Sequence, residues 1–205
     1  MSTRQHWEHV YQTRATDAVG WYQAEARMSR ALIEVVAPDR DAVIVDIGGG
    51  ASVLADELLA AGYRNLTVVD LSGAALAKAR ERIGARASEV EWQEADVLEY
   101  PFPEASLDVW HDRAVFHFLT DPDQRARYAS KMRRALRSGG LVVIGTFAPD
   151  GPETCSGLPV ERHSPDTLQD VFGPECVLVQ SQREVHVTPG ATEQPFNWCV
   201  FRKSA

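Results

Sequence analysis

The sequence has few of the features that mark membrane, secreted or zinc-binding proteins. None of its apolar runs approaches the roughly 20 residues that a membrane-spanning helix needs, and its first residues lack the apolar centre of a signal peptide. Cysteine is scarce: Cys155, Cys176 and Cys199 are odd in number and without CxxC spacing, so neither a disulfide framework nor a zinc knuckle is predicted. These absences favour a soluble cytoplasmic protein with reduced thiols.

Basic residues are also in deficit, and no run of like charges, repeat or low-complexity tract occurs. The formal net charge of −8 argues against nucleic acid as the main partner, because duplex binding depends on basic side chains that neutralise phosphates. A small molecule or a basic protein segment fits this charge better. The length of 205 residues predicts a single domain over 1–205.

What the sequence does have is a regular alternation of short apolar runs and amphipathic segments. The apolar runs predict strands at 42–47, 66–70, 90–96, 107–112 and 141–147, and helices are expected at 25–36, 52–61, 73–83 and 124–137. This order predicts an α/β doubly wound, Rossmann-like fold with helices on both faces of a mostly parallel seven-stranded sheet. A hairpin from 177–187 to 194–202 adds a terminal antiparallel strand, so the core spans 42–203.

The most informative motif is a turn of three glycines, Gly48 to Gly50, directly after Asp46 at the end of the first strand. A second acid, Asp70, ends the next strand 24 positions later, the separation expected for a carboxylate that binds ribose. A nicotinamide-dependent oxidoreductase is one interpretation, but Val53 occupies the place of the last glycine in the dinucleotide fingerprint. Asp46 also suits an ammonium group better than a diphosphate.

These residues resemble the class I S-adenosylmethionine-dependent methyltransferases, in which an acid-x-Gly-x-Gly turn follows the first strand. The resemblance covers nearly the whole chain, although Ser138 replaces a common proline before the fifth strand and Ser52 replaces a frequent third glycine. It implies that the cofactor is S-adenosylmethionine and one product S-adenosylhomocysteine. The implied cofactor site comprises Asp46, Gly48, Gly49 and Gly50 at the methionine, Asp70 at the ribose, Leu71, Asp96 and Val97 at the adenine, and Asp112 from the fourth strand.

The methyl acceptor is expected to bind beyond the carboxyl ends of the strands, where ligands of open parallel sheets lie. The aromatic-rich segment 1–23 is interpreted as a lid, similar to the N-terminal segment of the thiopurine and protein-lysine branches; its aromatics could equally pack the first helix onto the sheet. The expected acceptor-binding residues are Trp21, Tyr22, Gln23, Arg113, Cys155, His163 and Gln194.

Four residues are candidates for catalysis: His111, Asp112, Cys155 and His186. His111 or Asp112 could act as a general base, although a histidine at a strand end is commonly a hydrogen-bonded structural residue. Cys155, Cys199 and a histidine could form a soft-ligand site, as in metalloid methyltransferases, without a resident metal.

The predicted acceptor is therefore a small soft nucleophile, a thiol or a metalloid thiolate, because direct displacement at a methyl carbon needs alignment above all. A protein lysine is the alternative, since an acidic rim attracts it. Nucleic-acid amines are disfavoured, because His111 to Val115 lacks the Asn/Asp-Pro-Pro-aromatic signature. A binding module without catalysis is a further alternative.

Overall fold

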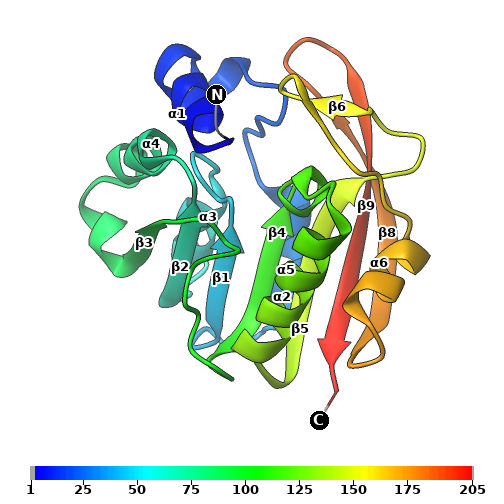
Figure 1. Ribbon diagram of the computed structural model, residues 1–205. Helices are drawn as coiled ribbons and strands as arrows, with labels where there is room; N and C mark the ends of the chain where they lie inside the picture. Colours follow the sequence, from blue (N-terminus) through cyan, green and yellow to red (C-terminus); the bar gives the residue numbers. More distant parts are fainter. Residues whose placement is uncertain (1–2, 205) are drawn as a thin grey trace.

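The computed structural model describes residues 3–204; positions 1, 2 and 205, which belong to the expected lid and domain, lie outside the described residues. Figure 1 shows a twisted central sheet with helices on both faces and the carboxyl ends of its parallel strands at one edge. The strands of the sheet are β1 (Val43–Ile47), β2 (Asn65–Asp70), β3 (Val90–Glu94), β4 (Leu107–Arg113), β5 (Leu136–Phe147), β8 (Cys176–Val187) and β9 (Glu193–Lys203). The α-helices are α1 (Thr3–Thr13), α2 (Arg27–Val36), α3 (Leu54–Ala60), α4 (Gly73–Ile83), α5 (Pro122–Ala135) and α6 (Pro165–Phe172).

The strand order is β3-β2-β1-β4-β5-β9-β8. The first five strands pair in parallel, and β9 pairs antiparallel with both β5 and β8. The predicted fold class is confirmed, with the antiparallel strand inserted beside β5 and β8 left at the sheet edge. The order reverses between β1 and β4, and this switch point is where open α/β sheets bind ligands.

Both faces of the sheet are buried, which explains why its strands read as continuous apolar runs. Ile44 and Val143 face the core under α2 and α3, whereas Val45 and Ile144 face the core under α5 and α6. Helix ends follow local chemistry: Ser72 caps α4 by accepting from the Ala75 amide at 3.1 Å.

Helix α1 lies across the carboxyl edge of the sheet, above β1 and β2 (Figure 1), and packs against α4. The Glu8 carboxylate accepts hydrogen bonds from Ser72 Oγ at 2.7 Å and from the Ala74 amide at 3.2 Å. Arg4 pairs with Glu94 at 2.8 Å. These contacts hold the first turns of α1 over the strand ends.

The remaining regular pieces are short and lie mostly in connections. They are the hairpin β6 (Thr154–Cys155) and β7 (Leu158–Pro159) and the 3-10 turns η1 (Thr16–Ala18), η2 (Gly84–Glu89) and η3 (Phe116–Phe118). The sequence patterns predicted neither this hairpin nor α6. Within residues 3–204, no helix has the length and apolar character needed to cross a membrane.

Candidate functional site

The turn after β1 is built so tightly that only glycine fits its centre. A Cβ on Gly49 would lie 2.3 Å from Asp46 Oδ2, and Gly48 and Gly50 have φ angles of +65° and +40°. The Gly48 amide donates to the Val69 carbonyl at 2.7 Å, which ties the turn to β2. The three glycines therefore place the backbone of the turn close to the Asp46 carboxylate. No side chain of the turn covers the backbone or this carboxylate from the space above the turn.

Asp46 is held by a buried histidine. His111, its neighbour in the β1–β4 register, donates from Nδ1 to Asp46 Oδ1 at 2.7 Å, and His111 Nε2 lies 2.9 Å from Ser29 Oγ. Both ring nitrogens are engaged, so His111 orients the carboxylate rather than offering a free basic nitrogen. The hydrogen-bonded structural interpretation of this histidine fits these contacts.

Asp70, at the end of β2, is a buried carboxyl group with little hydrogen bonding. Its Oδ1 accepts from the Ser72 amide at 2.8 Å, and Oδ2 lies above Gly50. Burial raises the pKa of Asp70 to about 7, and the nearby charge of Asp46 adds to this rise. The hydrogen bond from the Ser72 amide acts in the opposite direction and lowers the pKa. A ligand that donated hydrogen bonds to this carboxylate would restore its ionised form.

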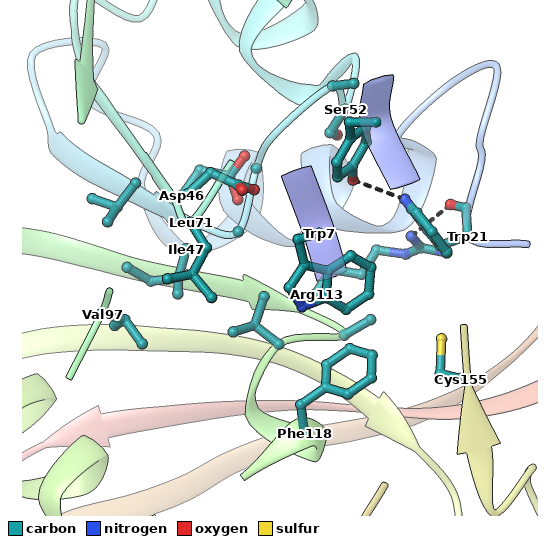
Figure 2. Close-up of a pocket in the computed structure, with 18 of the residues that line it drawn as sticks. Trp7, Trp21, Asp46, Ile47, Ser52, Leu71, Val97, Arg113, Phe118 and Cys155 are labelled. Atoms are coloured by element: carbon teal, nitrogen blue, oxygen red, sulfur yellow. Dashed lines mark hydrogen bonds between the residues drawn. The ribbon is translucent and has the colours of Figure 1, made fainter. Parts of the chain in front are cut away.

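One cavity of about 500 Å³ joins these residues to the segments that cover them. Its acidic end comprises Asp46, Asp70 and Asp96 with the apolar side chains of Leu71 and Val97. Its aromatic end comprises Trp7, Trp21, Phe118 and Cys155. Figure 2 shows Asp46, Leu71 and Val97 on one side of the cavity and Trp21, Arg113 and Cys155 on the other.

The aromatic end is a packed cluster contributed by α1, the segment after it and η3. Trp7 makes edge-to-face contacts with Trp21 and Phe118, with ring centroids 5.5 and 5.1 Å apart. Trp21 Nε1 donates to the Tyr11 hydroxyl at 3.0 Å (Figure 2), and burial raises the pKa of Tyr11. This end of the cavity is suited to a flat, apolar molecule.

Most of the residues expected to bind ligands or to take part in catalysis line the cavity. These are Asp46, Gly48, Gly49, Asp70, Leu71, Asp96, Val97, His111, Arg113, Trp21, Tyr22, Gln23 and Cys155. Burial raises the pKa of the Cys155 thiol to about 11, so this cysteine is protonated near neutrality. Ser29, Trp7 and Phe118 also line the cavity but were not among the expected binding residues.

Asp112 was expected in the cofactor site and as a base, but it does not line the cavity. Its fully buried carboxylate accepts from the Tyr128 hydroxyl at 2.6 Å and from the amides of Val115 at 3.0 Å and Phe116 at 3.1 Å. Alternate residues of β4 point to opposite faces of the sheet, so Asp112 turns away from the face that His111 and Arg113 share. Its environment fits a structural role.

The other expected residues that do not line the cavity are Gly50, His163, His186 and Gln194. His163 is buried beside Phe116, with ring centroids 5.1 Å apart. His186 donates from Nε2 to the Gly20 carbonyl at 2.8 Å, opposite Gln194 in the β8–β9 hairpin. His186 therefore contacts the backbone next to Trp21, whereas His163 packs beside a core residue that does not line the cavity.

The expected soft-ligand cluster is not formed. Cys155 belongs to the core on one face of the sheet and Cys199 to the core on the other. Among the residues that the structure describes, no group of three or more His, Cys, Asp or Glu side chains is placed to hold a metal ion.

Comparison with known proteins identifies similar domains. Residues 44–140 match the family model described as "Methyltransferase domain". A protein named "eEF1A lysine and N-terminal methyltransferase" from Danio rerio is 28% identical over 152 residues, 73% of this chain and 22% of that protein. The chain thus spans about a fifth of the length of the first curated relatives it matches.

Two solved structures show the same fold at low sequence identity. N-methyltransferase NodS from Bradyrhizobium japonicum, in complex with S-adenosylhomocysteine, has a TM-score of 0.76 at 17% identity and is covered over its full length, as is this chain. The 1,6-didemethyltoxoflavin-N1-methyltransferase of Burkholderia thailandensis has a TM-score of 0.76 at 24% identity, over 98% of this chain and 87% of that chain.

Proposed function

We propose that the chain is a class I S-adenosylmethionine-dependent methyltransferase, as its fold and its matching central domain support, and that it methylates a small thiol. The observation that carries the proposal is the convergence of Asp46, Asp70 and Asp96 with the glycine turn on one cavity that continues into an aromatic end. The first half of this cavity suits a charged nucleoside, and the second half leaves room for an acceptor.

The residues present fit S-adenosylmethionine. Asp46, held by His111, would pair with the ammonium group of the methionine part, and the buried Asp70 would accept hydrogen bonds from two ribose hydroxyls. Leu71 and Val97 would enclose the adenine, with Asp96 beside them. When bound, this cofactor supplies a methyl group on a positively charged sulfur, which keeps the electron pair of the broken C–S bond.

A thiol fits the acceptor end because the cavity offers no free base. Both nitrogens of His111 are engaged, Asp112 faces the opposite core, and Cys155 holds its own proton. About a few per cent of an ordinary thiol has already lost its proton to water near neutral pH, before it enters the cavity, and this thiolate sulfur attacks without assistance. The aromatic cluster around Trp7 would exclude water from the aligned reactants and so support direct displacement.

A second candidate is a protein amine, favoured by the names of the relatives that match about 70% of this chain. A lysine ammonium must lose a proton before it can attack, and the cavity supplies no free base for that step. It would also be repelled by the guanidinium of Arg113, which lines the cavity. These two arguments favour the thiol.

Binding and transfer test the proposal in sequence. Calorimetry should give a micromolar dissociation constant for S-adenosylhomocysteine and no detectable binding of nicotinamide dinucleotides. Radiolabelled methyl groups should then pass to aromatic and aliphatic thiols. Transfer into one protein of a cell lysate with none into thiols would replace the thiol by a protein acceptor, and cofactor binding without any transfer would indicate a binding module.

A further inference from the structure

Tyr11 of α1 has a hydroxyl group whose proton has no acceptor among the described residues. The side chain of Tyr11 lines the cavity, and its Oη accepts a hydrogen bond from Trp21 Nε1 at 3.0 Å (Figure 2). Within residues 3–204 this is the only hydrogen bond of the hydroxyl group, so the group still has a proton to donate. Burial raises the pKa of Tyr11, so the hydroxyl keeps this proton at neutral pH.

The hydroxyl of Tyr11 lies close to the carboxylate of Asp70, which also lines the cavity. A Cβ on Gly50 would be 3.4 Å from Tyr11 Oη and 2.7 Å from Asp70 Oδ2. The two groups do not bond to each other: within the described chain, Asp70 accepts a hydrogen bond only from the Ser72 amide. A donor and an acceptor therefore lie near each other at the cavity without being joined.

A ligand hydroxyl group matches this pair, because a hydroxyl both donates and accepts hydrogen bonds. Its proton would go to Asp70 Oδ2, and its oxygen would accept the proton of Tyr11. A ligand ammonium group has no lone pair for Tyr11, and a ligand carboxylate would meet the negative charge of Asp70. The pair therefore favours a hydroxyl, and Asp70 is the residue expected to hold the ribose of the cofactor.

We propose that Tyr11 donates a hydrogen bond to the ribose hydroxyl that itself donates to Asp70, so that Tyr11 is a specificity-determining residue for the cofactor. The bond from Trp21 Nε1 holds the Tyr11 oxygen in place for this contact. Helix α1 then recognises the sugar as well as packing over the strand ends. This inference rests on the proposed methyltransferase function and adds to its cofactor site a residue outside the sheet.

The test is calorimetry of the full chain with four ligands: S-adenosylhomocysteine, its 2′-deoxy and 3′-deoxy analogues, and 5′-methylthioadenosine, which has the ribose but no amino-acid carboxylate. Tyr11→Phe should bind S-adenosylhomocysteine and 5′-methylthioadenosine about five- to tenfold more weakly than the wild type does. One of the two deoxy analogues should bind the wild type and Tyr11→Phe equally within about twofold, because it lacks the acceptor for Tyr11. Weak ligands are measured by displacement of S-adenosylhomocysteine.

Tyr100→Phe is the matched control. Tyr100 is half-buried outside the cavity, and its hydroxyl makes no hydrogen bond with the described residues, so this variant should bind all four ligands as the wild type does. Tyr11→Phe keeps the aromatic ring that packs edge-to-face against Trp21, and thermal unfolding verifies that the variant is folded.

Three results would overturn the role of Tyr11. An equal loss in Tyr11→Phe for S-adenosylhomocysteine and both deoxy analogues would mean that the hydroxyl only supports the shape of the site. A loss for S-adenosylhomocysteine with none for 5′-methylthioadenosine would assign the hydroxyl to the amino-acid carboxylate instead, and unchanged affinity for every ligand would leave it without a ligand. Failure of the wild type to bind S-adenosylhomocysteine would remove the proposed function itself, so the two failures are distinguishable.

Discussion

Lowering the pH from about 7.5 to about 5.5 should weaken S-adenosylhomocysteine binding roughly 25-fold through Asp70 alone. Burial raises the pKa of this carboxyl group to about 7, and only the ionised form accepts hydrogen bonds from two ribose hydroxyls. With a pKa of about 7, roughly three quarters of the protein is ionised at the higher pH and about 3% at the lower one. The dissociation constant, measured by calorimetry at both values, should follow that ratio.

Stability of the ligand-free protein should change in the opposite direction. The folded-state pKa of Asp70 lies above the ordinary aspartate value of 3.8, so the folded chain takes up a proton that the unfolded chain does not as the pH falls. This proton should add about 2 kcal/mol to the free energy of unfolding between pH 7.5 and 5.5, at 1.36 kcal/mol per pH unit over most of that interval. Thermal unfolding without ligand measures it.

Asp70→Asn is the decisive control because it keeps the shape of the side chain and removes its titration. The Asp46–His111 pair, Glu8 and Arg4 also face this region, so only the difference between wild type and variant belongs to Asp70. The variant should bind S-adenosylhomocysteine about tenfold more weakly at pH 7.5 and lose most of the pH dependence. An equal pH dependence in wild type and Asp70→Asn would refute the argument.

Three further outcomes follow from the contacts. Gly49→Ala would place a methyl group 2.3 Å from Asp46 Oδ2. Calorimetry should show that this variant binds S-adenosylhomocysteine at least about tenfold more weakly. Unchanged affinity would mean that the turn accommodates the methyl group without displacing Asp46. Asp112→Asn should cost about 1–3 kcal/mol of unfolding free energy in denaturant titration, since Tyr128 loses a charged acceptor, and an unchanged midpoint would argue against its structural role. The three buried cysteines should react slowly with a thiol reagent at about pH 8 and fully after denaturation, whereas fast reaction of Cys155 in the native protein would restore it as a reactive group.

The sheet and the acidic end of the cavity could be predicted because both depend on short patterns in the sequence. Strands buried on both faces are mostly apolar. Each therefore stands out in the sequence as an apolar run, such as Val43–Ile47, with an acidic residue at or near its end. Carboxyl ends of parallel strands share one edge, so Asp46 and Asp70 had to come near each other once the strands were recognised. The spacing of the acidic residues along the chain and the parallel arrangement of the strands were enough to predict this part of the site.

The acceptor end could not be predicted in the same way. His111, Asp112 and Arg113 are consecutive residues of β4. The side of the sheet to which each side chain points decides whether it reaches the cavity or the opposite core. The strict alternation along a strand could have shown that Asp112 is not placed with its two neighbours. The distance of His186 from the cavity depends instead on the insertion of β9 between β5 and β8, which no local pattern encodes.

That insertion also governs the order in which the sheet can assemble. In the described chain β8 pairs only with β9, so it cannot join the sheet until β9, which follows it, has docked on β5. The Ile144–Cys199 pairing closes a long loop, and the conformational entropy of this loop is lost before the pairing gains any contact. Until that step the apolar edge of β5, from Val142 to Ile144, lies open, and it is there that a folding chain is exposed to pairing with a neighbouring molecule.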